Sequence, residues 1–170
     1  TDDVSSLLRD TGSRAGGIVI LGSAYAYGLA TGTHHIRETA QLAAQAVLIT
    51  QTIGGVKWLT GRERPKDSPD DSWNWGNDGG HAFFSGHSSG VWSAAGVFVE
   101  RYPDNDAFKL GVYSWATAVS LTRINDDAHW ASDLLVGGLV GYGVGVMVAR
   151  YDPFIENNAV VMPTLNADYG

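Results

Sequence analysis

Apolar positions in this chain occur in long segments rich in Ala, Gly, Leu and Val, without the strict alternation typical of half-buried strands. The pattern therefore predicts helices, and the expected fold class is all-α. Residues 1–12 have the length of one additional short helix. The longer helices are expected at residues 15–31, 36–60, 88–101, 105–121 and 129–149.

Two segments lack helical periodicity. The stretch between Gly61 and Gly86 is rich in Pro, Asp and Gly, which predicts a long irregular loop of a size often associated with function. Residues 152–170 contain two further prolines and predict an irregular tail. Because neither a linker nor an internal repeat is visible, the 170 residues predict a single domain, a bundle of five to six helices.

Small residues recur every fourth position in the last predicted helix, at Gly137, Gly141, Gly145 and Ala149. One helix face is therefore bare, and another backbone can approach it closely. The uncharged run 134–149 would be only about 24 Å long as a helix, whereas a bilayer core needs about 20 residues. The pattern favours tight packing in a soluble or peripheral protein, with a membrane helix as the alternative.

Charge and cysteine content narrow the classes of function. The net charge is −7 and the pI is about 5.0, which disfavours nucleic acid or an anionic membrane as a general partner. An anionic substrate would need a local basic cluster. The chain has no cysteine, which excludes thiolate chemistry, disulfides and metal sites built on Cys.

Lys57 and Arg64 form the first group of candidate residues. They lie seven positions apart, on one helix face if the helix persists that far. Pro65 would then end the helix, because a proline disfavours helical conformation in the residue before it. A solvated surface is the ordinary interpretation of such a pair, and Arg62 between them is assigned to the surface.

Ser85, Gly86 and His87 form the second group, directly before an apolar helical run. Glycine permits a tight turn, and the free N–H groups at a helix start can bind an anion. Ser85 or Ser88 could instead simply cap the helix. Capping does not explain His87, because a charged histidine is disfavoured beside a helix N-terminus.

Arg123, His129 and Asp133 form the third group. A histidine and an aspartate four residues apart share one helix face, so the carboxylate can accept from one ring nitrogen and leave the other lone pair exposed. This arrangement orients an imidazole nucleophile. A structural hydrogen bond or a metal-binding pair fits the same spacing.

Taken together, the patterns K-x6-R-P, S-G-H and R-x5-H-x3-D, in this order, resemble the type-2 phosphatidic acid phosphatase family. Its superfamily also contains bacterial class A acid phosphatases and vanadium haloperoxidases, so the resemblance implies their helical-bundle fold. Two positions differ, since Phe84 and Thr122 stand where the family usually has Pro and Ser. Phe84 loses a rigid turn residue but no chemical group, and Thr122 keeps a hydroxyl.

The resemblance implies a phosphatase that works through a phosphohistidine. His129 would attack phosphorus, Asp133 would orient it, and His87 would protonate the leaving oxygen and then activate water. No metal or other cofactor is implied, and vanadate or phosphate is expected to bind as an inhibitor. The phosphate-binding residues implied by the motifs are Lys57, Arg64, Ser85, Gly86 and Arg123.

The expected substrate is a phosphorylated small molecule or lipid, isoprenoid diphosphates included. Aromatic residues of the long loop, Trp73, Trp75, Phe83 and Phe84, are predicted to line the leaving group, while His81 is interpreted as a structural loop residue. Membrane association fits this substrate class, and the sequence does not determine the oligomeric state. The resemblance and a start without Met favour an extracytoplasmic, periplasmic location.

Three alternatives compete with this interpretation. A vanadate-dependent haloperoxidase would use the same residues, although those enzymes are typically much larger. A helical membrane protein without catalytic activity would explain the glycine-striped helix. A metal hydrolase would use His87, His129 and Asp133 as ligands.

Overall fold

The computed structural model describes residues 2–151, and within this range it contains helices and irregular segments but no strand. The all-α prediction is confirmed. The tail predicted over residues 152–170 lies outside the described residues. The elements are α1 (Asp2–Thr11), α2 (Arg14–Thr31), α3 (His34–Ile53), the 3₁₀ turn η1 (Gly54–Val56), α4 (Lys57–Thr60), α5 (Gly86–Arg101), α6 (Asp106–Asn125) and α7 (Ala131–Tyr151).

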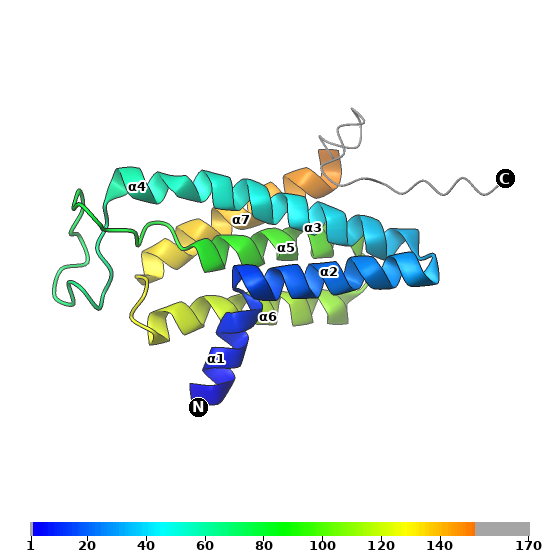
Figure 1. Ribbon diagram of the computed structural model, residues 1–170, viewed down its shortest axis with the longest axis horizontal. Helices are drawn as coiled ribbons and strands as arrows, with labels where there is room; N and C mark the ends of the chain where they lie inside the picture. Colours follow the sequence, from blue (N-terminus) through cyan, green and yellow to red (C-terminus); the bar gives the residue numbers. More distant parts are fainter. Residues whose placement is uncertain (1, 152–170) are drawn as a thin grey trace.

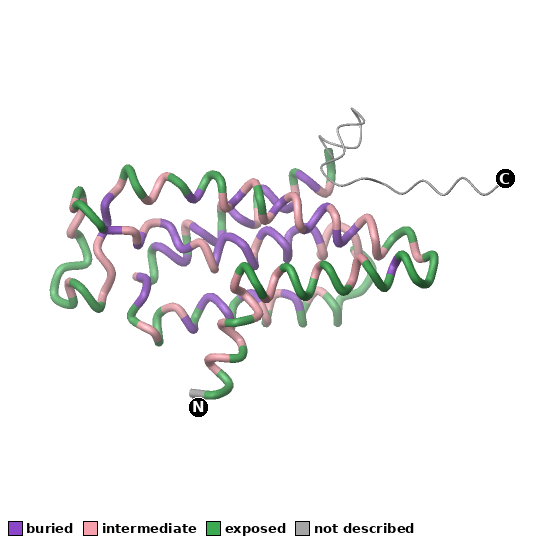
Figure 2. The backbone as a smooth tube through the Cα atoms, in the orientation of Figure 1, coloured by how far each residue is buried: buried purple, intermediate pink, exposed green. Residues whose placement is uncertain are grey.

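Helix α5 forms the centre of the bundle and packs against α3, α6 and α7 (Figure 1). Its sequence is rich in Ser, Gly, Ala and Val, and most of its residues from Ser88 to Val97 are buried. Figure 2 shows the buried positions concentrated on this central helix and on the sides of its neighbours that face it. Two apolar clusters hold the bundle together, one between α3, α5 and α7 and one between α5 and α6.

Helices α5 and α7 cross at very short distance, as the glycine pattern predicts. A methyl group on Gly141 or Gly145 would overlap the carbonyl oxygen of Ser89 or Ser93. A methyl group on Gly137 would lie 2.8 Å from the carbonyl oxygen of Ser85. The glycines therefore bring the first turn of α7 directly against the first turn of α5.

Helix α7 is long and apolar enough to cross a membrane, judged by length and composition alone. Of its apolar window, 44% is buried inside the bundle. Several of its large side chains nevertheless face outward, including Leu135 and Leu139.

The predicted helix 36–60 is interrupted and ends before Arg64. It divides into α3, η1 and α4, and Gly61 then ends α4 in the left-handed conformation with φ of 57°. A side chain on Gly61 would also lie 2.7 Å from the backbone nitrogen of Asn77. The predicted end of the helix at residue 60 is confirmed, but the helix is not continuous through residues 54–56. Because it does not persist to Arg64, Lys57 and Arg64 do not share a helix face.

The loop over residues 61–85 is irregular, as predicted, and is held by its own backbone hydrogen bonds. The N–H of Ala82 donates to the carbonyl of Arg62 at 2.9 Å, and the N–H of Glu63 donates to the carbonyl of Asn74 at 3.1 Å. Figure 1 shows this loop at the end of the bundle where α5 and α7 begin. The three groups of candidate residues therefore meet at one end of the molecule.

Candidate active site

The start of α5 is fixed by Ser85, which is fully buried. Its hydroxyl accepts from the N–H of Ser88 at 3.4 Å, so Ser85 is the helix cap that the sequence offered as an alternative. Its own N–H donates to the carbonyl of Asp133 at 3.1 Å. The S-G-H segment is thereby attached to the first turn of α7.

His129 is 6% exposed, and its ring is held by the long loop. Nδ1 lies 2.7 Å from the carbonyl oxygen of Ala82. Because a carbonyl oxygen can only accept, the geometry assigns the proton to Nδ1 and leaves Nε2 with a lone pair. Among the described residues no hydrogen bond engages Nε2.

Asp133 does not accept the ring proton of His129 as the sequence suggested. The closest carboxylate oxygen, Oδ2, lies 3.8 Å from Nδ1, too far for a hydrogen bond. Oδ2 accepts instead from the N–H of Trp130 at 2.9 Å, and Oδ1 accepts from Arg62. The direct partner of the ring is the backbone carbonyl of Ala82, in the loop between α4 and α5.

Arg62 is buried and 3% exposed, so its assignment to the surface is wrong. The left-handed turn at Gly61 redirects the chain and sends Arg62 inward. Its guanidinium pairs with Asp133 and donates to the Ser132 hydroxyl at 2.8 Å and the Ser72 carbonyl at 2.7 Å. The motif spacing gave no sign of this, because Arg62 lies between two motif positions.

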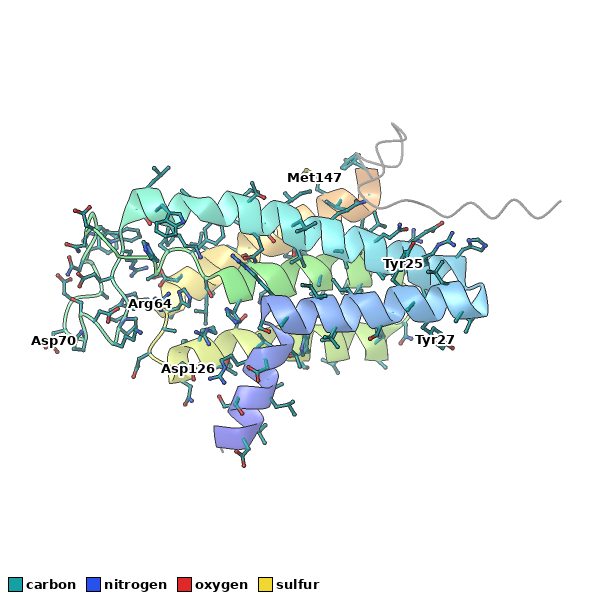
Figure 3. All side chains as sticks on the ribbon, viewed as in Figure 1. Tyr25, Tyr27, Arg64, Asp70, Asp126 and Met147 are labelled. Atoms are coloured by element: carbon teal, nitrogen blue, oxygen red, sulfur yellow. The ribbon has the colours of Figure 1, made fainter. Side chains whose placement is uncertain are left out.

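The three predicted phosphate-binding cations lie within electrostatic reach of one another. Burial lowers the pKa of Lys57, and the charges of Arg64 and Arg14 lower it further. Burial also lowers the pKa of Arg123, with Arg9 and Arg64 adding to the effect against the opposing Asp126. Figure 3 shows Arg64 and Asp126 at the same end of the bundle. Mutual repulsion of this kind indicates a site that needs an anion to be balanced.

Gly86 places the start of α5 beside these cations. A methyl group on Gly86 would lie 3.5 Å from the Lys57 ammonium nitrogen. Within residues 2–151, neither Lys57 nor Arg64 forms an ion pair with a carboxylate. An unpaired Lys57 next to a helix N-terminus, with Arg64 within its electrostatic reach, favours binding of an oxyanion.

His87 follows Gly86, and its pKa is strongly shifted from the ordinary value of a histidine. Burial lowers its pKa from 6.5 to about 4, and the charges of Arg123, His129, Lys57 and Arg9 contribute in that order. His87 is therefore neutral at pH values above about 4. The same charges show that His87 lies near both His129 and the cations.

Two further residues reach the site that the motifs did not indicate. The side-chain amide of Gln51, on α3, donates to the carbonyl of Gly86 at 2.9 Å. Arg9, on α1, lies 3.7 Å from the Asp126 carboxylate oxygen that accepts from Arg123 at 2.8 Å. Neither residue stands in a recognisable pattern, because packing of distant helices alone brings them here.

The aromatic residues of the loop pack on one another in series, Trp73 on Trp75, Trp75 on Phe83 and Phe83 on Phe84. Trp75 packs edge-on against Phe83, with ring centroids 5.2 Å apart, and Phe84 is buried. Trp73 is 78% exposed. Trp58 of α4, which the sequence analysis did not single out, stacks on His81 with centroids 4.0 Å apart. An apolar leaving group would therefore meet α4 as well as the loop.

No group of three or more His, Asp or Glu side chains is arranged to hold a metal ion within residues 2–151. His129 and Asp133 are both occupied by protein partners, the Ala82 carbonyl and Arg62 respectively.

Comparison with known protein families identifies the family to which the chain belongs. A family model described as the PAP2 superfamily matches residues 39–155. The chain belongs to the PAP2 superfamily. The match contains all the motif residues from Lys57 to Asp133, whereas Arg9 and Arg14 precede it.

A solved structure supports the same PAP2 fold. The crystal structure of Aquifex aeolicus LpxE superposes with a TM-score of 0.69 at 18% sequence identity, covering 88% of this chain and 86% of that chain. No curated protein matches the sequence significantly. As a PAP2 member, this protein is a phosphatase, an enzyme that hydrolyses phosphoric esters.

Proposed function

We propose that this PAP2 phosphatase hydrolyses phosphomonoesters through a phosphohistidine formed on His129. The observation that carries the proposal is the state of the His129 ring, which donates from Nδ1 to Ala82 and keeps the Nε2 lone pair. A buried imidazole fixed in this tautomer is prepared to act as a nucleophile.

In the first step, Nε2 of His129 forms a bond to phosphorus while the bond from phosphorus to the ester oxygen breaks. The electron pair of that bond leaves with the oxygen, which takes a proton from His87. Lys57, Arg64 and Arg123 bind the phosphoryl oxygens, together with the Gly86 N–H and Ser85. Fixed positive charge around the phosphoryl group is the main requirement of this transfer.

His87 must carry a proton to serve as the acid in that step. Burial lowers its pKa most, and the charges of the surrounding cations lower it further. A bound phosphate dianion compensates these cations and thus favours the protonated ring. In the second step, neutral His87 accepts a proton from water as the water oxygen attacks phosphorus and the bond to Nε2 breaks, releasing inorganic phosphate.

The substrate class that we propose is a phosphate ester with an apolar leaving group, lipid phosphates included. Two exposed aromatic residues, Trp58 and Trp73, lie on α4 and the loop, and Leu59, which follows Trp58 in the chain, is 86% exposed. Apolar side chains this exposed favour contact with an apolar substrate or a lipid surface.

We also propose an extracytoplasmic, periplasmic location with peripheral attachment to the membrane. Exposed apolar residues on α2 and α7, such as Ile18 and Leu139, support the attachment. Fractionation of cells that express the full-length precursor tests the proposal, which fails if the protein is recovered from the cytoplasm.

Trapping of the phosphoenzyme separates the roles of the two histidines. His129→Ala should abolish both the adduct and activity with every substrate. His87→Ala should still form the adduct with an aryl phosphate, whose good leaving group needs no proton, and the adduct should accumulate because attack by water is slow. Rapid quench with a labelled aryl phosphate, followed by alkaline workup, preserves phosphohistidine.

The control is His34→Ala, which changes an exposed histidine of α3 and should behave as wild type. Absence of any adduct in the wild-type enzyme would refute the covalent mechanism. An adduct on His129→Ala but not on His87→Ala would reverse the assignment. Full activity in EDTA is expected, and loss of activity there would favour the metal hydrolase.

A further inference from the structure

We propose that Arg62 is a positioning residue, which holds the nucleophile His129 in its reactive tautomer and orientation through two separate connections. The proposal rests on the assignment of His129 as nucleophile. It concerns a residue that is outside the motif positions and does not contact the phosphate-binding cations.

The first connection runs through the backbone. The carbonyl of Arg62 accepts from the N–H of Ala82 at 2.9 Å, and the carbonyl of the same Ala82 accepts from Nδ1 of His129 at 2.7 Å. The position of the acceptor that selects the His129 tautomer is thus set by the position of residue 62. A nearby glycine makes this contact tight, since a side chain on Gly80 would collide with the backbone of Gly61 and Arg62.

The second connection runs through the side chain. The guanidinium of Arg62 binds Asp133, which is fully buried, and donates to Ser132 at 2.8 Å. Asp133 in turn accepts from the N–H of Trp130. Through Asp133, the forked guanidinium of Arg62 therefore holds the peptide group that follows His129. Together the two connections form a closed circuit of contacts, which leads from Arg62 through Ala82, His129 and Asp133 back to Arg62.

The guanidinium of Arg62 is itself held by several contacts, so it can anchor these two connections. Its guanidinium carbon lies 4.7 Å from the ring centre of Trp75 and 5.8 Å from that of Trp130. Its second terminal nitrogen donates to the Ser72 carbonyl at 2.7 Å. Lysine is a poor substitute at this position, because its ammonium group lacks the planar, forked set of donors with which the guanidinium binds between two aromatic rings.

Arg62 also compensates the charge of Asp133 next to the nucleophile. An uncompensated carboxylate 3.8 Å from Nδ1 would compete with the neutral Ala82 carbonyl for the ring proton. With Arg62 on Asp133, the Ala82 carbonyl keeps the proton and the ring keeps its orientation. The expected role of Asp133 thus becomes indirect, through Arg62.

The test compares Arg62→Met, which removes the charge and fork at similar length, with Arg62→Lys, which keeps only the charge. Both variants should lower kcat and the rate of phosphoenzyme formation, Arg62→Met by about 100-fold, because misplacement by about 1 Å costs that much. KM should change by less than about threefold, since Lys57, Arg64 and Arg123 remain. Nitrogen NMR of the His129 ring should report Nδ1–H with an unprotonated Nε2 in wild type and a larger fraction of doubly protonated ring in Arg62→Met, because the uncompensated Asp133 carboxylate stabilises the imidazolium.

The matched control is Arg150→Met, which removes a bidentate arginine pair to Glu100 on the exposed surface, away from the site. It should leave kcat and the His129 spectrum unchanged. A residue with a purely structural role would lower thermal stability but leave kcat of the folded enzyme and the His129 spectrum unaltered.

A folded Arg62→Met with wild-type kcat and wild-type His129 spectrum overturns the proposal. If Arg62→Met does not fold, Arg62→Lys and Ser132→Ala decide by the same two readouts, and wild-type values in both variants overturn it. If wild type forms no phosphoenzyme, the proposed mechanism fails by itself, while the NMR comparison still decides whether Arg62 sets the ring of His129.

Discussion

The two histidines of the site differ in their surroundings, and this difference can give them different duties. His129 is held by a backbone carbonyl from a loop, whereas His87 stands at the start of α5 among cations. A carbonyl fixes a tautomer without adding charge, while burial and the neighbouring cations favour the neutral form of His87. A bound oxyanion compensates these cations and therefore favours the protonated form of His87 that can act as an acid.

The titration of His87 predicts a pH dependence of stability. Its pKa is about 4 in the folded protein and 6.5 in the unfolded chain, so the unfolded chain binds more protons between these values. The free energy of unfolding should therefore decrease as the pH falls from 6.5 to about 4, and this cost is fully present below about 4. At about 1.4 kcal/mol per pKa unit the upper limit is ~3 kcal/mol, and partial exposure to water reduces it.

Urea unfolding of wild type and His87→Gln between pH 4 and 7 measures this contribution. The difference between the two proteins cancels the carboxylates that also titrate in this range. His87→Gln should gain stability relative to wild type at pH 4 and lose that advantage by pH 7. Parallel curves for the two proteins would contradict burial of His87 among cations. His34→Gln, an exposed histidine on α3, is the control.

At the scale of elements, the active site depends on how closely α5 and α7 approach. Gly137, Gly141 and Gly145 place the α7 backbone against α5, so the S-G-H segment of α5 meets the first turn of α7. Periodicity in the sequence predicted this bare face. It could not identify the partner helix, because small residues occur on several helices and only the folded bundle pairs two of them.

Two glycines of α7 offer a matched test of this packing. Gly141→Ala places a methyl group on the carbonyl oxygen of Ser89, whereas Gly143→Ala meets nothing within 4 Å. Gly141→Ala should lower the free energy of unfolding by about 1–3 kcal/mol or more. Gly143→Ala should raise it by about 0.5–1 kcal/mol, because alanine favours the helix. Equal effects of the two substitutions in urea unfolding would refute the close crossing.

Boundaries between elements were predicted less well than the elements themselves. The helices at both ends of the long loop begin and end close to the expected residues, since caps and glycines mark them locally. The 3₁₀ turn after Ile53 was missed, because an apolar, glycine-containing run fits a continuous helix equally well, and the inward direction that the chain takes at Gly61 was not predicted although the helix end was. This error moved Arg62 from the core to the surface in the prediction.

At the scale of the whole molecule, motif residues were predictable and their supports were not. The resemblance to the type-2 phosphatidic acid phosphatases indicates Lys57, His87 and His129 from the sequence, whereas the spacing of each group alone left a structural interpretation open. The Ala82 carbonyl carries no side-chain signal, and Arg9 lies before the segment that matches the family. Residues that hold the motif side chains in place act through tertiary contacts between segments distant in the chain, and a local sequence pattern does not reveal such contacts.

The distribution of charge and apolar surface over the molecule bears on membrane attachment. The chain carries a net charge of −7, yet large apolar side chains are exposed along α2 and α7. Leu135 and Leu139 lie four residues apart on one face of α7 and are 68% and 75% exposed. Attachment should therefore be driven by apolar contact and opposed by anionic lipids.

Co-sedimentation with vesicles, in the absence of detergent, measures this attachment. We expect binding to neutral phosphatidylcholine vesicles and weaker binding when anionic lipid is added. The double variant Leu135→Gln/Leu139→Gln should bind at least about tenfold more weakly, since burial of one leucine is worth about 1.5–3 kcal/mol and each tenfold about 1.4 kcal/mol. Activity on a water-soluble aryl phosphate should not change.

Leu110→Gln, at an exposed position of α6, is the control. If the wild-type protein stays in the supernatant at every lipid concentration, α7 serves only the packing of the bundle and the proposed membrane attachment is wrong.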